Sequence, residues 1–193
     1  MAVCGGGKIV LSKIRKGPWQ VEASTQKYKS PWLEVTEDKV IKPNGQPGSF
    51  ATVKLKPGVS VLAIGDGDEV YLTSEYRYAI EQKSIEVVSG ATEADETPEM
   101  TARRELREEL GIEAGSWVDL GTVDPLTSLL RSPARLFLAR ELSFFEPNAD
   151  DSEIIEMVRM KLNEAVEMVM DSKITHAPSC VLILKAHHLL TLK

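Results

Sequence analysis

Residues 90–112 decide how this chain is interpreted; they read GATEADETPEMTARRELREELGI. Thr97 is a favourable residue at the start of a helix, and Pro98 suits the first helical position because proline lacks an N–H that must be paired there. Gly111 follows the last apolar residue of the run, where glycine commonly closes a helix. The stretch therefore predicts a loop that leads into a helix between Thr97 and Gly111.

Three carboxylates share one face of this predicted helix. Glu105 lies three residues before Glu108 and four before Glu109, and residues at these spacings are neighbours on a helix surface. Like charges so placed destabilise an isolated helix, and a hard divalent cation with oxygen ligands offsets the repulsion. The alternative is an ordinary solvated helix, in which Arg104 and Glu108 form a surface pair of only a few tenths of a kcal/mol.

The wider spacing of the motif favours the metal site. The chain resembles the Nudix hydrolases, because it contains their signature in full at Gly90, Glu96, Arg104-Glu105-Leu106, Glu108-Glu109 and Gly111-Ile112. The resemblance implies that Glu105 and Glu109 bind Mg²⁺, with Mn²⁺ as a possible substitute. It also implies that Arg104 orients the carboxylates, that Glu96 supports them, and that Glu108 is a further candidate catalytic residue.

The segment before the motif resembles one branch of this family, the ADP-ribose and nucleoside-diphosphate-sugar pyrophosphatases. Glu75-Tyr76-Arg77 is similar to that branch's Gln-Tyr-Arg motif, and residues 85–90 are similar to its Glu-x-Pro-Ala-Gly segment, with Val88 in place of Pro and Ser89 in place of Ala. The resemblance implies that Arg77 binds the substrate diphosphate or sugar, a role that suits a forked guanidinium. The alternative is a surface arginine in a strand.

Two neighbours of this segment receive roles from the same resemblance. Glu86 is expected to position substrate or to hold Arg77, and the alternative is a structural salt bridge. Ser89 is expected to offer its backbone carbonyl to the metal, so that the change from Ala matters little.

An acidic run near residue 150 resembles the loop that supplies a further metal ligand and often the catalytic base. By position, Glu153 matches the metal ligand, and Asp151 falls where some members have a glutamate base. The shorter aspartate leaves the base open between Asp151, Glu153 and, if the loop is remote, Glu108. The alternative is an ordinary solvated loop.

The rest of the chain predicts a mixed α+β protein of the Nudix fold, with β-sheets sandwiched by helices and an antiparallel β extension at the N-terminus. We expect residues 1–55 to form the extension and residues 56–193 the Nudix domain. Pro43-Asn44-Gly45 and Gly65-Asp66-Gly67-Asp68 predict hairpin turns. The expected strands are Lys8–Ile14, Trp19–Lys27, Trp32–Ile41, Ser49–Leu55, Val59–Ile64, Glu69–Thr73, Ile85–Val88, Trp117–Val123, Ala134–Leu142 and Glu153–Met160, and the expected later helices are Leu162–Met170 and Pro178–Leu190.

The N-terminal extension carries a candidate substrate contact. Members of the resembled branch often form homodimers in which this sheet covers the partner's site, and an aromatic side chain there stacks on the base. Trp32 is the candidate for that role, and we expect a homodimer. The pattern itself favours core packing for Trp32 over this role.

Composition limits the class of protein. The chain has 193 residues, a formal net charge of −6 and 27% charged residues, which indicates a folded protein and argues against nucleic acid as a partner. Its two cysteines make no metal or redox spacing, and no apolar run reaches the ~18 residues of a membrane span. We therefore expect a cytoplasmic protein with no membrane partner. His176, His187 and His188 have no partner spacing, and we predict no metal or catalytic role for them.

These observations predict Mg²⁺-dependent hydrolysis of the diphosphate bond of ADP-ribose or a related nucleoside diphosphate sugar, which gives a nucleoside monophosphate and a sugar phosphate. Two alternatives stay open. One is a Nudix hydrolase of another substrate, such as a dinucleoside polyphosphate, NADH, capped RNA or an oxidised nucleotide. The other is a Nudix-fold sensor that binds ADP-ribose without cleaving it.

Overall fold

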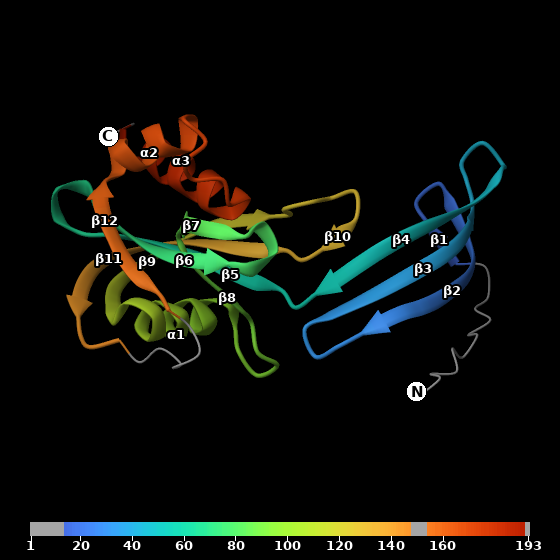
Figure 1. The fold of residues 1–193 in the computed structure, drawn as a ribbon, viewed down its shortest axis with the longest axis horizontal. Coiled ribbons are helices and arrows are strands. Elements are labelled where there is room, and N and C mark those ends of the chain that lie inside the picture. The colour runs from blue at the N-terminus through green and yellow to red at the C-terminus, as the bar shows by residue number, and fades with distance from the viewer. Residues whose placement is uncertain (1–13, 148–153, 192–193) are drawn as a thin grey trace. The chain divides into compact units, whose positions relative to one another are not determined.

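The computed structural model describes residues 14–147 and 154–191, which form two compact units. The N-terminal unit extends to Lys56 and also includes Leu126–Ser132. The predicted boundary at residue 55 did not assign this second segment to it. Its sheet has the order β1-β2-β3-β4-β10 (Figure 1). The strands are β1 (Ile14–Lys16), β2 (Trp19–Lys29), β3 (Leu33–Ile41), β4 (Pro47–Leu55) and β10 (Leu130–Arg131). The first four pair antiparallel, and β10 joins through a parallel pairing of Leu130 with Val53.

The turn between β3 and β4 confirms the hairpin predicted from Pro43-Asn44-Gly45. Gly45 has a φ of +81°, a conformation that glycine adopts without strain, and its N–H donates to the Lys42 carbonyl at 2.9 Å. The Asn44 side chain accepts a hydrogen bond from the Gln46 N–H at 3.1 Å. Turn chemistry of this kind sets the register of the two strands, and Ile41 pairs with Pro47.

The second unit comprises residues Pro57–Pro125 and Pro133–Lys193. Its strands are β5 (Gly58–Ile64), β6 (Glu69–Arg77), β7 (Gln82–Glu86), β8 (Val88–Ala91), β9 (Ile112–Val123), β11 (Ala134–Phe144) and β12 (Glu156–Lys161). Its helices are α1 (Pro98–Leu110), α2 (Leu162–Met170) and α3 (Ala177–Thr191), with short 3₁₀ turns at Asp66–Asp68 and Tyr78–Ile80. Within the described residues the sheet has the order β12-β6-β5-β11-β9, with β7 on β6 and β8 on β5. Among the described strands of this unit, only β5 and β11 pair parallel, so the sheet is mixed, as predicted.

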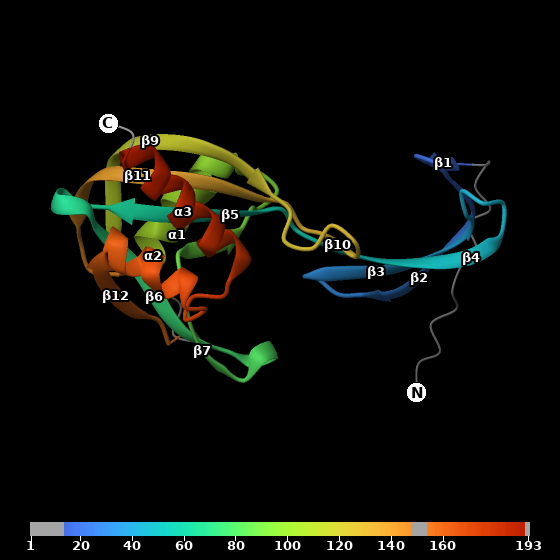
Figure 2. The same cartoon turned by 90° about the horizontal axis from the view of Figure 1, so that it is seen from above.

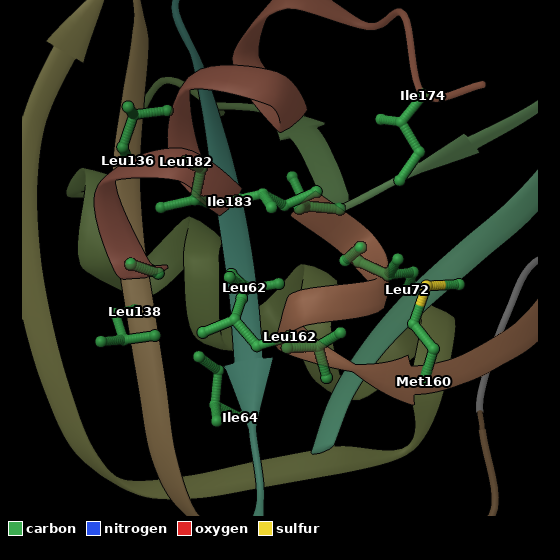
Figure 3. Close-up of a cluster of buried hydrophobic side chains, with 14 residues drawn as sticks. Leu62, Ile64, Leu72, Leu136, Leu138, Met160, Leu162, Ile174, Leu182 and Ile183 are labelled. Carbon is green, nitrogen blue, oxygen red and sulfur yellow. The ribbon is translucent and has the colours of Figure 1, made fainter. Parts of the chain in front are cut away.

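Helices cover both faces of this sheet. Figure 1 shows α1 on one side of β5 and β11, and α2 and α3 on the other; Figure 2 gives the same strands and helices seen from above. Alternate side chains of β5 serve the two faces, since Val61 packs in one buried cluster with Leu106 of α1 and Leu62 packs in the other with Leu182 of α3 (Figure 3). The predicted arrangement of helices around a mixed sheet is confirmed.

Helix α1 begins and ends where the sequence predicts. The Thr97 hydroxyl accepts a hydrogen bond from the Met100 N–H at 3.2 Å, and Pro98 is the first helical residue. Gly111 adopts the left-handed conformation at φ +62°, and its N–H donates to the Arg107 carbonyl at 3.1 Å. Both ends of the helix that carries the acidic face are therefore fixed by local sequence.

The strand predicted at Ile85–Val88 is the main departure from the expected elements. It divides into β7 and β8, and the break falls at Val87. The Val87 N–H donates to the hydroxyl of Ser179 on α3 at 3.0 Å instead of continuing a strand ladder. The break between β7 and β8 thus depends on a hydrogen-bond partner 92 residues further along the chain, which no local sequence pattern predicts. In residues 14–147 and 154–191, no helix is long and apolar enough to cross a membrane.

Candidate active site

The acidic face of α1 lies against β8. A Cβ atom built on Gly90 of β8 would overlap the carboxyl group of Glu105. The side chain of Glu105 is only 13% exposed in this position. The absence of a side chain at Gly90 therefore creates the space that the Glu105 carboxylate fills, and brings that carboxylate against the β8 backbone.

Arg104 joins three of the motif's carboxylates. Its guanidinium contacts both oxygens of Glu96, at 2.7 Å from Nε and 3.0 Å from Nη2. Its Nη1 donates to Glu105 Oε1 and to Glu108 Oε2, each at 2.9 Å. Nη2 also lies 3.3 Å from the Ala91 carbonyl of β8. One planar cation thus fixes the loop, the helix and the strand relative to one another.

The contact between Arg104 and Glu96 keeps both groups charged. The hydrogen bond from Arg104 is the largest influence on Glu96 and, against the opposing effect of burial, lowers its pKa to about 2. The Glu93 N–H and the Thr101 hydroxyl also donate to Glu96, which favours its ionised form further. The same contacts raise the pKa of Arg104 above its ordinary value. Arg104 therefore does more than the plain i,i+4 pairing with Glu108 that was the alternative.

The chemistry of the residues on this face fits a hard divalent cation. Glu105, Glu108 and Glu109 supply carboxylate oxygens, the donors that Mg²⁺ prefers, and Gly90 lets the strand backbone approach them. Within the described residues, no three acidic, His or Cys side chains are already arranged to enclose an ion. Arg104 contacts Oε1 of Glu105 and Oε2 of Glu108. Whether Glu105, Glu109 and the Ser89 carbonyl bind metal stays a prediction.

A cleft of about 430 Å³ adjoins this face, and Arg77 lines it. Arg77 Nε and Nη2 donate to the two oxygens of Glu86, at 3.2 and 2.9 Å, and Nη1 lies 2.7 Å from Glu75. Ser89 lines the same cleft and precedes Gly90, which contacts Glu105. Two consecutive residues of β8 therefore link the cleft to the acidic face. The two hydrogen bonds from the Arg77 guanidinium fit the interpretation that Glu86 holds Arg77. A contact of either residue with substrate stays a prediction.

The charges of this pair are mutually stabilised. Burial is the largest single influence on Glu86, which is 5% exposed, and would raise its pKa, but the contacts with Arg77, His176 and Ser84 together lower it. Burial is likewise the largest influence on Arg77 and would lower its pKa, but the surrounding carboxylates, Glu86 foremost, together raise it. Glu75 and Glu109 act on Arg77 in the same direction as Glu86. Glu109 is thus close enough to Arg77 to influence its charge, which links the cleft to α1.

The remaining predicted residues are placed as follows. The Ser89 hydroxyl lies 2.9 Å from that of Ser60 and donates to the Val87 carbonyl at 3.1 Å. Asp151 and Glu153 lie outside the described residues. Trp32 belongs to the N-terminal unit and is 73% exposed, so core packing is wrong for this residue because most of its ring faces solvent. Its contact with substrate stays a prediction.

Sequence reasoning missed His176, which lines the cleft with Arg77 and Glu86. Its Nδ1 lies 3.4 Å from Glu86 Oε2 and 2.8 Å from the Ser179 hydroxyl. We expected no metal or catalytic role for His176 because the sequence has no partner residue near it at a ligand spacing. Glu86 lies 90 residues earlier in the chain, so only the packing of α3 against β7 and β8 brings the two together.

Comparison with known proteins adds to this geometry. The model of the NUDIX domain matches residues 54–179, which is more than half of the chain. The chain belongs to the Nudix family. Residues 19–53 match the model described as the nucleoside diphosphate sugar hydrolase N-terminal domain. As a member of the Nudix family the protein is a pyrophosphohydrolase, and Nudix hydrolases generally use a divalent metal ion.

Individual relatives agree with the family assignment. The Nudix chain is 28% identical over 163 residues to an ADP-ribose pyrophosphatase of Bacillus subtilis (strain 168), covering 83% of this chain and 88% of that protein. It is 29% identical over 159 residues to a methanol dehydrogenase activator of Bacillus methanolicus, covering 78% and 83%. A crystal structure of an ADP compounds hydrolase superposes with a TM-score of 0.78 at 19% identity, covering 94% and 97%, and this likeness supports the fold.

Proposed function

We propose that this Nudix enzyme hydrolyses the diphosphate bond of ADP-ribose or a related nucleoside diphosphate sugar in the presence of Mg²⁺, giving a nucleoside monophosphate and a sugar phosphate. The observation that carries the proposal is that two charged features lie at neighbouring residues of β8. The acidic face of α1, held by Arg104, adjoins a cleft in which Arg77 is fixed by Glu86. A diphosphate with organic groups at both ends suits such a site, because it needs both cationic contacts and a metal.

We assign the chemistry to these residues as follows. Glu105 and Glu109 would hold the metal, which would neutralise phosphate oxygens and lower the pKa of water. Arg77 binds oxygens of the diphosphate or sugar. A carboxylate, Asp151 or Glu153 or else Glu108, takes a proton from the attacking water. The water oxygen bonds to one phosphorus, the bridging P–O bond breaks, and the second phosphate leaves with its organic group.

The relatives support the choice of substrate. The Bacillus subtilis relative is named for ADP-ribose, and the N-terminal match is to a domain of nucleoside diphosphate sugar hydrolases. A sensor that only binds ADP-ribose has no need of the whole set of acids, whereas Arg104 here organises Glu96, Glu105 and Glu108 together. The relative named as a methanol dehydrogenase activator is a reason to keep other nucleotides in the test.

A substrate panel tests the proposal. The purified protein is incubated with Mg²⁺, Mn²⁺ or EDTA and with ADP-ribose, ADP-glucose, GDP-mannose, diadenosine polyphosphates, NADH or capped RNA, and products are separated by chromatography. We expect release of AMP and ribose 5-phosphate from ADP-ribose, or the matching products from another sugar nucleotide, and loss of activity in EDTA. Faster cleavage of a dinucleoside polyphosphate or capped RNA would contradict the substrate class. Binding of ADP-ribose without any cleavage would favour the sensor.

We also propose that the protein works as a cytoplasmic homodimer and that Trp32 contributes to substrate binding. The support is the N-terminal match and the exposure of Trp32, which leaves its indole ring accessible to a ligand or a partner. Light scattering after gel filtration measures the mass directly, and a mass near 21.3 kDa would contradict the dimer. Trp32→Ala should raise KM and leave the melting temperature unchanged, because this side chain is not part of the core.

A further inference from the structure

His176 occupies a position in the cleft that the proposed mechanism does not use. It immediately precedes α3 and lines the same cleft as Arg77, with 30% of its side chain exposed. Its Nδ1 contacts the Ser179 hydroxyl at 2.8 Å. The ring is thus held at Nδ1 by a residue of α3, and this contact leaves its second nitrogen, Nε2, available.

The hydrogen bonds of Ser179 decide the protonation of the ring. The Ser179 hydroxyl accepts from the Val87 N–H at 3.0 Å and has one hydrogen of its own to donate. In the described part of the chain, its remaining contact is His176 Nδ1, and we assign that nitrogen as the acceptor of the hydroxyl hydrogen. A neutral imidazole whose Nδ1 accepts carries its hydrogen on Nε2. Burial also lowers the pKa of His176, which agrees with a neutral ring.

The Nε2–H group is therefore a donor within the cleft. Among the described residues Nε2 has no hydrogen-bond partner, while Nδ1 is engaged. The neighbouring Arg77 is fixed by Glu86 and Glu75, so it cannot turn to pair with the ring. A neutral donor beside a fixed cation suits an oxygen-rich, anionic group, because it adds a directional hydrogen bond to the charge of the guanidinium.

We propose that His176 is a substrate-binding residue, which donates from Nε2 to a phosphate or hydroxyl oxygen of the nucleoside diphosphate sugar in the cleft lined by Arg77. The inference rests on the proposed function for the class of ligand. The competing role is structural, in which His176 serves only to hold Ser179 and, through it, the break between β7 and β8 at Val87.

Two substitutions distinguish the role of Nδ1 from that of Nε2. Asparagine places a polar atom close to the position of Nδ1 and nothing at Nε2, whereas glutamine reaches the position of Nε2 and leaves Nδ1 empty. His176→Asn therefore keeps the contact with Ser179 and removes the donor to substrate. His176→Gln keeps the donor and removes the contact. His188→Asn is the matched control, since His188 is exposed near the end of α3.

The measurement is ADP-ribose binding by calorimetry in EDTA, so that neither turnover nor metal enters it, together with KM and the melting temperature. We expect His176→Asn to weaken binding about three- to tenfold and to raise KM similarly, as loss of one hydrogen bond predicts. His176→Gln and His188→Asn should bind within about twofold of wild type. The melting temperature of His176→Asn should match that of the wild type.

Each other result has a defined meaning. The reverse pattern, with His176→Gln weaker in binding and lower in melting temperature while His176→Asn is normal, would assign His176 a structural role and overturn the inference. Equal binding by all variants would overturn it as well, as would failure of the wild type to bind ADP-ribose. Weakened binding by His176→Asn in a protein that cleaves nothing would support the inference and overturn the proposed function alone.

Discussion

The carboxyl group of Glu105 occupies the space that a side chain at position 90 would fill, so Gly90 and Glu105 form one feature of the site. The helix residue and the strand residue are 15 positions apart, and their contact joins α1 to β8. Glycine weakens a strand interior, so the glycine at this position is explained by the space it leaves for Glu105 rather than by the needs of β8.

Gly90→Ala tests this relationship. The added methyl group must displace the Glu105 carboxylate, which is the end of a flexible side chain, so we expect a displaced ligand in a folded protein. The metal concentration for half-maximal activity should rise at least about tenfold, in the range seen when a metal ligand loses its orientation. Gly48→Ala is the control, because its Cβ would meet only the end of the Lys42 side chain in the N-terminal unit. Normal metal dependence in Gly90→Ala would show that Glu105 does not bind metal.

Arg104→Lys should lower kcat about 10- to 100-fold while the protein stays folded. A lysine keeps the charge but has no planar fork, so it cannot hold Glu96, Glu105 and Glu108 at once. Arg103→Lys is the matched control on the same helix, since Arg103 pairs with the exposed Glu99 and stacks on Trp117. Steady-state kinetics of both variants measure the effect, and equal losses would mean that Arg104 has no special positioning role.

Glu109→Gln should lower kcat at least about 100-fold, because a carboxamide has no charge with which to hold a divalent cation. The melting temperature in EDTA should stay within about 3 °C of wild type, and the stabilisation that Mg²⁺ confers on the wild type should be lost. Glu99→Gln supplies the comparison, as an acid on the same helix that lies on the exposed face. A Glu109→Gln enzyme with near-normal kcat would remove Glu109 from the set of ligands.

Acid should weaken the fold partly through Glu96. Its pKa is about 2 in the folded protein and 4.5 ordinarily, so its contact with Arg104 contributes fully above pH 4.5 and is lost as pH falls toward 2. Wild type should therefore exceed Glu96→Gln in melting temperature at neutral pH, and the difference should shrink between pH 4.5 and 2. Calorimetry across this range measures it. A difference that stays constant down to pH 2, or a Glu96 titration midpoint above pH 4 by NMR, would contradict the strength of this ion pair.

Much of the fold was predictable because it depends on near neighbours in sequence. The bounds of α1 follow from Thr97 and Gly111, and the β3–β4 hairpin follows from Asn44 and Gly45, since caps and turns involve atoms a few residues apart. The acidic face was equally readable, because helical spacing alone brings Glu105, Glu108 and Glu109 together.

Contacts between distant segments were not predictable in this way. The division of one expected strand into β7 and β8 depends on the bond from Val87 to Ser179, and the addition of residues 126–132 to the N-terminal unit depends on the pairing of β10 with β4. Both involve partners that no period or spacing connects. Core packing of Trp32 was a wrong expectation. An apolar side chain in a strand pattern does not indicate which face of the sheet is covered by other residues.

The sequence by itself determined the family, the helix with its acidic face and the two motifs that contain Arg77 and Arg104, because each of these depends on residues close together in the chain. Only the tertiary structure decided that Glu105 fills the space at Gly90, that Glu86 takes both donors of the Arg77 fork, and that His176 enters the cleft. These three contacts arise where β7, β8 and the start of α3 pack together. Packing of this kind depends on shape and burial across the whole core, which a linear pattern does not encode.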